Sequence, residues 1–167
     1  KLLGKEIVSA SIVFSDKPKY ERYPHAWKLS LPFLITKIQT EQGTIRLLTA
    51  HFHVSYECLE TLQIWQNAER VAEYVEAADN TPLIFTGDLN IRNESMAIKT
   101  LSEKMTQQSR DFTNTLTPSI HPVFQLNLAD PLRPIDHIFT KNVSVSDCQV
   151  REVVVSDHLP LVLDFSL

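Results

Sequence analysis

The feature that most constrains the fold is a short apolar segment, Leu83-Ile84-Phe85-Thr86, that runs directly into Gly87-Asp88-Leu89-Asn90. A continuous apolar run of this length predicts a strand that is covered on both faces. Before it, apolar residues recur at steps of three and four between Leu59 and Val75, which predicts an amphipathic helix. The sequence therefore favours a layered fold of mixed helices and strands.

The predicted helix has recognisable ends. Ser55 is the expected N-cap, and Asp79-Asn80-Thr81-Pro82 is expected to end the helix. Residues 94–106 predict a second helix with a weaker apolar face. Residues 107–134 contain several prolines and are expected to be irregular. A loop of that length is usually functional or mobile.

Strand patterns lie on both sides of this central region. Alternating or β-rich segments predict strands at residues 8–14, 32–39, 44–50, 135–140, 143–155 and 159–165. Asp16 to Ser30 is expected to be a loop, and Glu41-Gln42-Gly43 is expected to close a hairpin. Because no repeat or domain boundary is visible, residues 1–167 are expected to form a single domain of the α+β class.

The charge balance limits the classes of partner. The 167-residue chain has a formal net charge of −4, and its basic residues are scattered rather than gathered in a stripe. This argues against a dedicated, non-specific nucleic-acid binder, which neutralises phosphates with clustered basic residues. It does not exclude a nuclease, because a metal ion supplies positive charge at a phosphate site.

Little in the sequence indicates a location. No apolar run reaches the roughly 18 residues that span a membrane, so no membrane span is expected. No signal peptide is visible, which says little because the chain begins at Lys1. Cys58 and Cys148 form no C-x-x-C pair and are expected to be buried apolar residues. Their pattern slightly favours the reducing cytoplasm, and the location otherwise stays open.

Chemically useful side chains lie at the ends of four predicted strands. They are His51, the pair Asp88 and Asn90, Asp136, and the pair Asp157 and His158. Asp136 lies in an otherwise apolar strand, where a carboxylate needs a partner such as histidine. Four strand ends that carry such groups favour a shared functional site.

Each group also has an ordinary alternative when it is taken alone. Asp88 and Asn90 can form a simple turn, since Gly, Asp and Asn are the usual turn residues. His51 can be a hydrogen-bonded core histidine. Other histidines can lie in surface loops, namely His158, His25, His53, His121 and His137. The set of residues, rather than any member, favours function.

With these motifs in this order, the chain resembles the C-terminal portion of the endonuclease/exonuclease/phosphatase superfamily, which includes the DNase I-like nucleases and the inositol polyphosphate 5-phosphatases. The matching segments are Thr49-Ala50-His51-Phe52, Gly87-Asp88-Leu89-Asn90, Ile135-Asp136-His137-Ile138-Phe139 and Ser156-Asp157-His158-Leu159-Pro160. The resemblance extends from about Ile7 onward. It implies a DNase I-like four-layer α/β/β/α sandwich that lacks much of its N-terminal half.

The resemblance implies a role for each motif residue. His158 resembles the histidine that acts on the attacking water or the phosphate, and Asp136 resembles the carboxylate that orients it. Asp88 resembles the residue that positions the nucleophilic water. Asn90 resembles the amide that donates to a phosphoryl oxygen. His51 resembles a histidine that hydrogen-bonds the phosphate.

The implied cofactor is Mg²⁺ or Mn²⁺, and the implied reaction is hydrolysis of a phosphoester in a small molecule or a nucleic acid. Asp157, Asp88 and Asn90 resemble the metal-associated residues, and oxygen ligands favour these ions. A Lewis acid and a positioned water suit phosphoester cleavage. The acidic balance favours a small-substrate phosphatase or phosphodiesterase over a duplex nuclease. Residues 107–134 are expected to shape the substrate pocket.

The family pattern also has an N-terminal half, with a strand that ends in Asn and a glutamate that is a principal metal ligand. Neither can be placed in this chain. We therefore expect a truncated chain that self-associates through an exposed sheet face. We also expect weak metal affinity and weak turnover from this chain alone.

Two other interpretations stay open. A non-catalytic interaction module can keep the same fold, although every C-terminal catalytic-type position holds the expected residue. An unrelated hydrolase with a Ser–His–Asp arrangement is disfavoured, because the chain has no G-x-S-x-G elbow.

Overall fold

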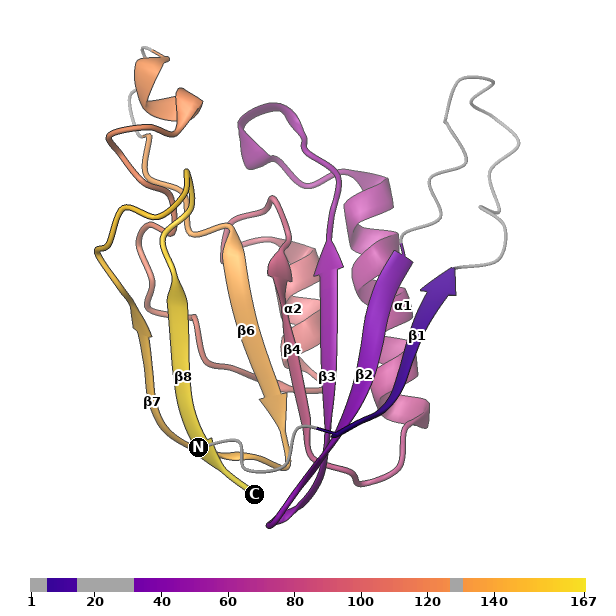
Figure 1. The fold of residues 1–167 in the computed structure, drawn as a ribbon. Coiled ribbons are helices and arrows are strands. Elements are labelled where there is room, and N and C mark those ends of the chain that lie inside the picture. The colour runs from indigo at the N-terminus through magenta and orange to yellow at the C-terminus, as the bar shows by residue number, and fades with distance from the viewer. Residues whose placement is uncertain (1–5, 15–31, 127–130) are drawn as a thin grey trace.

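The structure is a computed structural model that describes residues 6–14, 32–126 and 131–167. A six-stranded sheet has the order β1-β2-β3-β4-β6-β5, and a second sheet consists of β7 and β8 (Figure 1). The strands are β1 (Glu6–Phe14), β2 (Pro32–Thr40), β3 (Gly43–His51), β4 (Leu83–Asp88), β5 (Thr106–Gln107), β6 (Asp136–Lys141), β7 (Ser144–Val150) and β8 (Leu161–Ser166). The described helices are α1 (Leu62–Ala77), α2 (Met96–Ser102) and the 3₁₀ helices η1 (Tyr56–Cys58) and η2 (Pro122–Gln125).

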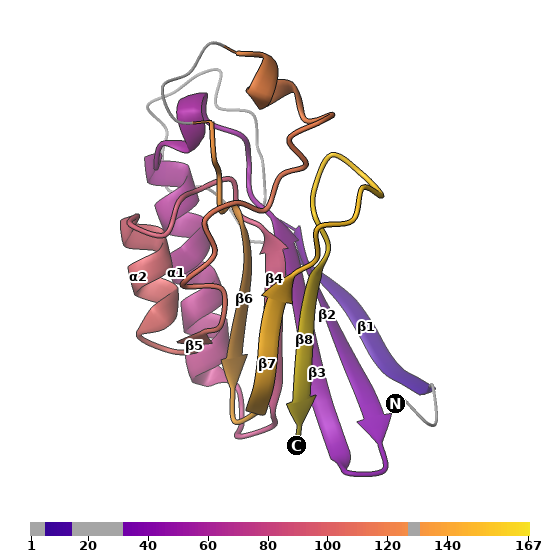
Figure 2. The same ribbon diagram turned by 90° about the vertical axis from the view of Figure 1, so that its left-hand side faces the viewer.

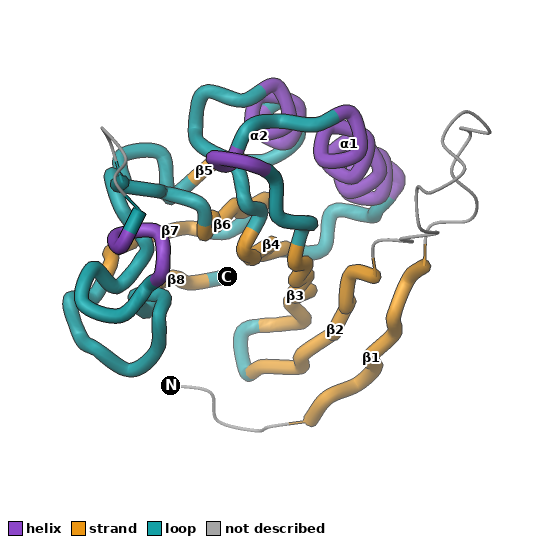
Figure 3. The backbone as a smooth tube through the Cα atoms, turned by 90° about the horizontal axis from the view of Figure 1, so that it is seen from above, coloured by secondary structure: helices purple, strands orange, loops and turns teal. Residues whose placement is uncertain are grey.

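The described elements form layers. Helices α1 and α2 cover one face of the six-stranded sheet, and β7 and β8 lie on the opposite face (Figure 2). The view from above shows the same order of helices, large sheet and small sheet (Figure 3). Three of the four expected layers, α/β/β, are therefore present in the part of the chain that the structure describes.

The larger core lies between α1, α2 and the six-stranded sheet. Ile64, Ala68 and Val71 repeat at the steps of a helix face, and each is 0 % exposed. They belong to the same buried cluster as Leu83 and Phe85 of β4. Burial of such aliphatic side chains contributes roughly 1.5–3 kcal/mol each relative to exposure. This core fixes β4 against the helical layer.

A smaller core lies between the two sheets. Ile84 of β4 and Ile138 of β6 pack there with Leu161 and Leu163 of β8. Because successive residues of a strand point to opposite faces, β4 is covered on both sides, which confirms the prediction made from residues 83–86. Parts of this inter-sheet face are open, since Leu34 is 38 % exposed and Phe165 is 41 % exposed. Self-association through that face stays a prediction.

Three element ends differ from the sequence prediction. Helix α1 begins after Thr61, whose hydroxyl accepts a hydrogen bond from the N–H of Ile64, so Ser55 is not its N-cap. Helix α2 ends at Ser102, because the chain then turns into β5 to pair with β6. Strand β7 ends at Val150, where its pairing with β8 also ends.

Other expectations have mixed outcomes. The hairpin of β2 and β3 is confirmed, and the described residues between β5 and β6 are largely irregular as expected. Cys58 and Cys148 are partly exposed, so the prediction that both are buried is wrong. The expected loop from Asp16 to Ser30 and His25 lie outside the described residues. No helix among the described residues is long and apolar enough to cross a membrane.

Gly87 shows why the motif after the covered strand contains a glycine. β3 and β4 are parallel, and Gly87 pairs with Ala50. A Cβ atom added at Gly87 would lie 2.0 Å from the carbonyl oxygen of Ala50, which is a backbone atom that cannot rotate away. Gly87 is therefore a strand residue that permits close approach of β3, rather than a turn former.

Replacement of this glycine tests the packing of the two strands. Gly87→Ala is expected to lower the free energy of unfolding by about 2 kcal/mol or more, since β3 and β4 must separate. Thr86→Ala, one residue earlier, is the matched control and is expected to cost about 1 kcal/mol or less. Urea denaturation followed by circular dichroism measures both, and equal losses would contradict the clash.

Candidate active site

Three neighbouring strands of the large sheet place polar side chains in one row. β3 and β4 pair His51 with Asp88, and β4 and β6 pair Asp88 with Asp136. Directly paired residues have Cβ atoms about 5 Å apart. The sheet register therefore brings together three predicted site residues that lie far apart in the sequence.

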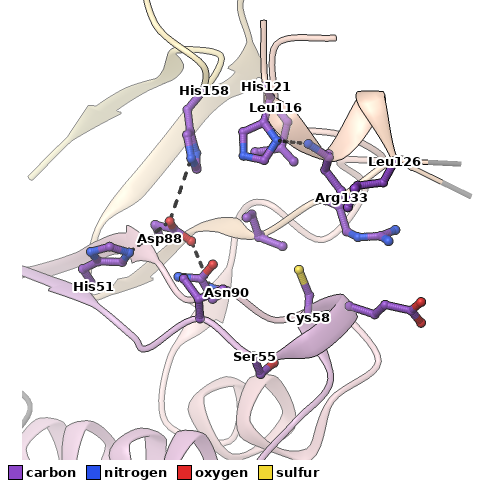
Figure 4. A pocket seen from close by; sticks show the side chains of 14 residues that line it. His51, Ser55, Cys58, Asp88, Asn90, Leu116, His121, Leu126, Arg133 and His158 are labelled. Atoms are coloured by element: carbon purple, nitrogen blue, oxygen red, sulfur yellow. Dashed lines mark hydrogen bonds and ion pairs between the residues drawn. The ribbon is translucent and has the colours of Figure 1, made fainter. Parts of the chain in front are cut away.

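His158 completes the cluster from the segment before β8. Its Nδ1 lies 2.8 Å from Oδ2 of Asp136, and its Nε2 lies 3.9 Å from Oδ2 of Asp88. Nε2 of His51 lies 3.3 Å from the same Asp88 oxygen. Figure 4 shows the Asp88 carboxylate between the two histidines. His158 is thus no surface-loop histidine, and His51, whose side chain is 70 % exposed, is no core histidine.

Asp136 is held in place by Thr115, which is 0 % exposed. The Thr115 hydroxyl donates to Oδ2 of Asp136 at 2.6 Å and accepts from the N–H groups of Ile135 at 3.2 Å and Asp136 at 3.1 Å. With one proton and two lone pairs, the hydroxyl then uses its full capacity. Because a carboxylate only accepts, Nδ1 of His158 carries the proton and Nε2 faces Asp88.

The irregular segment between β5 and β6 connects to the residues around His158. Leu116 forms an antiparallel bridge with His158. The N–H of Leu159 donates to the carbonyl of Thr115 at 2.8 Å, and the N–H of Thr117 donates to the carbonyl of Asp157 at 2.8 Å. Sequence reasoning missed Thr115, and no local pattern marks it, because its partners lie elsewhere in the chain.

Asn90 lies directly beside Asp88. Its φ of 53° is in the left-handed region, which asparagine tolerates better than most residues. Its N–H donates to Oδ1 of Asp88 at 3.0 Å, and its Nδ2 donates to the carbonyl of Phe52 at 2.9 Å. The second Nδ2 hydrogen and the Oδ1 atom are the groups that remain for a ligand. The predicted pair is therefore a rigid part of the site.

The surroundings of Asp88 and His158 raise the pKa of both groups. Burial, and then the nearby Asp136 carboxylate, raise the pKa of Asp88 above its ordinary value. The hydrogen bond that His158 donates to Asp136 raises the pKa of His158, which favours the imidazolium form. The cluster therefore holds more protons near neutral pH than isolated groups would, as is common at catalytic sites.

Three further histidines have different surroundings. His137 is 1 % exposed and faces the carbonyl of Ile91 through Nε2 at 2.9 Å, which excludes the alternative that it lies in a surface loop. Burial lowers the pKa of His137 to about 4, which keeps the ring neutral at neutral pH. His121 packs edge-on against His158, with ring centroids 5.6 Å apart. His53 contacts Thr61, the N-cap of α1.

Two groups of side chains have donor atoms close enough to hold a metal ion. Asp88, Asp136 and His158 form one group, and His121, Asp157 and His158 form the other. Asp157 belongs to the group that contains His121, and Asp88, which accepts a hydrogen bond from Asn90, belongs to the group that contains Asp136. The carboxylate oxygens of these groups and the amide oxygen of Asn90 are ligands of the kind that Mg²⁺ and Mn²⁺ prefer.

A pocket of about 770 Å³ opens beside this cluster. Its lining includes His51, Asp88, Asn90 and His158. The rest comes from the loop after β3 and from the irregular segment between β5 and β6, which was expected to shape a pocket. The polar cluster therefore lies at the wall of a cavity with room for a small molecule.

Residues 11–158 match the sequence profile described as the Endonuclease/Exonuclease/phosphatase family. The chain belongs to this family. The match spans most of the chain and includes three motif segments whole and the fourth as far as His158, so the resemblance and the DNase I-like α+β fold are confirmed.

Solved structures of the family share this fold. An endonuclease/exonuclease/phosphatase from Bacteroides vulgatus superposes with a TM-score of 0.73 at 19 % identity, over 98 % of this chain and 67 % of that chain. The mannosyl-6-phosphatase of Bacteroides thetaiotaomicron gives 0.73 at 16 % identity, over 98 % and 68 %. D. rerio TDP2, complexed with a single-strand DNA product, gives 0.68 at 13 % identity, over 97 % and 68 %.

These likenesses show the fold alone, because the identities are low. The chain spans about two thirds of each of these structures. No curated protein sequence matches it.

Substitution of Thr115 tests the support of Asp136. Thr115→Val leaves two N–H groups without their acceptor, so we expect the free energy of unfolding to fall by about 1–3 kcal/mol. Thr115→Ser keeps the hydroxyl, so its free energy of unfolding is expected to fall by less than that of Thr115→Val. Thr106→Val on exposed β5 is the control and is expected to change stability by about 0.5 kcal/mol or less. Urea denaturation measures the series, and a serine variant as unstable as the valine variant would contradict the hydroxyl's role.

Proposed function

We propose that this site performs divalent-metal-dependent hydrolysis of phosphoester bonds. The observation that carries the proposal is the Asp136–His158–Asp88 arrangement at the wall of an open pocket, with His51 on the far side of Asp88. The proposal is also supported by membership of a family whose description names nucleases and phosphatases. The intact geometry favours an enzyme over a non-catalytic interaction module.

Each residue of the cluster has a distinct part in this reaction. Asp136 accepts a hydrogen bond from the Nδ1–H of His158 and so directs Nε2 toward the phosphate. His158 hydrogen-bonds a phosphoryl oxygen or gives its proton to the departing alkoxide. Asp88 orients the attacking water and accepts its proton. The water oxygen bonds to phosphorus, the ester P–O bond breaks, and the alcohol leaves with a proton.

Two residues stabilise the charge that builds on the phosphoryl group. The second Nδ2 hydrogen of Asn90 donates to a phosphoryl oxygen while the first stays on the carbonyl of Phe52. His51 is largely exposed at the end of β3 and can hydrogen-bond another oxygen. Both come from strand ends, so they are rigid and need little rearrangement as charge develops.

A Mg²⁺ or Mn²⁺ ion would be held by Asp88, Asn90 and Asp157. When bound, such an ion polarises a phosphoryl oxygen and lowers the pKa of a coordinated water. The carboxylates in both groups supply the oxygen donors that support this choice over a softer metal.

A small phosphoester is favoured over duplex nucleic acid as the substrate. The chain has a net charge of −4, and the lining of the pocket contains two carboxylates, Glu57 and Asp88, against the one guanidinium of Arg133. A duplex binder neutralises many phosphates with lysine and arginine. Of the similar structures, one is a mannosyl-6-phosphatase and one is bound to a single-strand DNA product.

Hydrolysis of bis-p-nitrophenyl phosphate with Mg²⁺ or Mn²⁺ tests the function. His158→Ala and Asp88→Asn are each expected to lower kcat/KM by about 10²–10⁴-fold, because a proton-transfer group is lost. His53→Ala is the matched control, since this histidine contacts Thr61 and does not line the pocket. It is expected to keep the rate of the unaltered chain.

The test compares kcat/KM of each variant with that of the unaltered chain, so it stays valid even if the absolute rate is slow. Titration with inorganic phosphate, followed by phosphorus NMR, adds a readout that needs no turnover. Binding of phosphate that weakens in His158→Ala supports the site. Turnover that is independent of metal, or that survives in His158→Ala and Asp88→Asn, would contradict the proposal.

A further inference from the structure

The pocket beside the polar cluster has two chemically different parts. One wall carries the groups that handle water and phosphate. The remainder is lined mainly by apolar side chains, which are Val54, Leu116, Val123, Leu126 and Ile135. Figure 4 shows Leu116, Leu126 and Cys58 on the side of the pocket away from His51. The apolar part is thus continuous with the place where a phosphoryl group would lie.

The floor of this apolar part is rigid. Leu116 is 1 % exposed and Ile135 is 3 % exposed, so both are anchored in the protein. Leu116 is bridged to His158 through the backbone, and Ile135 N–H donates to Thr115. The same residues that hold the catalytic cluster therefore also fix the floor of the pocket.

The rim carries apolar side chains that the protein does not cover. Val54 is 73 % exposed and Leu126 is 58 % exposed, and both line the pocket. Apolar groups placed around a cavity mark a binding site more strongly than scattered ones do. They gain free energy when an apolar ligand removes them from water.

The loop that forms one side of the pocket has a constrained backbone. Glu57 and Cys58 have φ values of 51° and 57°, which place two consecutive non-glycine residues in the left-handed region. Such conformations persist where the surrounding structure holds them, and they are frequent at ligand sites. Burial raises the pKa of the Cys58 thiol, so this side chain is uncharged at neutral pH, while the adjacent Glu57 adds a carboxylate to the lining.

We propose that the substrate is the phosphoester of an apolar, ring-sized alcohol, whose ring lies in this apolar part while its phosphoryl group lies against His158 and Asn90. The inference rests on the proposed function, and it adds the chemical class of the leaving alcohol. The volume of about 770 Å³ is in the range of pockets that bind drug-sized molecules. Water attack releases the ring alcohol with its proton and leaves the phosphoryl group with the new oxygen.

Binding of two phosphomonoesters tests this class directly. The probes are 1-naphthyl phosphate and glycerol 2-phosphate, which share the phosphoryl group and differ in the apolar ring. Calorimetric titration of the chain is expected to show the naphthyl ester binding at least about tenfold more tightly, because its ring is removed from water. Equal affinities for the two probes, or no binding of the naphthyl ester, would overturn the inference.

Two substitutions that leave the charge of the chain unchanged test where the ring lies. Leu126→Ser is expected to weaken binding of the naphthyl ester by about threefold to tenfold. The same substitution is expected to change the affinity for the glycerol ester by less than about twofold. Ile120→Ser is the matched control, because Ile120 is 46 % exposed, lies in the same segment and does not line the pocket. It is expected to alter neither affinity. Equal effects of the two substitutions would overturn the placement of the ring.

Release of 1-naphthol with Mg²⁺ or Mn²⁺ separates this inference from the proposed function. Tight, Leu126-dependent binding without metal-dependent release of naphthol supports the pocket and contradicts the hydrolase. Hydrolysis of both esters with equal kcat/KM and equal affinity supports the hydrolase and overturns the pocket.

Discussion

The hydrogen bond between Asp136 and His158 joins the two sheets at the site, and the geometry of the cluster depends on it. Asp136 begins β6 of the large sheet, and His158 precedes β8 of the small sheet. Their contact at 2.8 Å fixes which nitrogen of His158 faces Asp88. Thr115 holds the carboxylate from a third segment. One buried hydroxyl thus links the irregular segment, the sheet and the histidine.

The register of β3, β4 and β6 is the second constraint. A slip by one residue would turn His51, Asp88 or Asp136 to the other face of the sheet, away from His158. The two cores prevent such a slip, because Phe85 is buried against the helices and Ile84 against the small sheet. Packing far from the pocket therefore sets the positions of its polar groups, and the close approach at Gly87 keeps β3 and β4 together.

The sequence predicted the parts of the site that follow regular strands. His51, Asp88 and Asp136 were expected at strand ends because strand periodicity and the covered strand are local patterns. Thr115 and His121 were not assigned to the site, because they lie in an irregular segment whose place depends on pairing with distant residues. The place of His137 stayed open for a related reason, since only the fold shows that β6 turns it toward Ile91. The layered fold followed from patterning, and the pocket depended on non-local contacts.

The protonation site of His158 tests the account most directly. Nitrogen NMR of the chain, recorded at a pH where the His158 ring is neutral, distinguishes a protonated Nδ1 from a protonated Nε2. The account predicts the Nδ1–H form, with a loss of this preference in Asp136→Asn and its retention in His53→Ala. An Nε2–H form in the unaltered chain, or the same tautomer in Asp136→Asn, would contradict the claim that Asp136 directs Nε2 of His158 toward Asp88 and the phosphate.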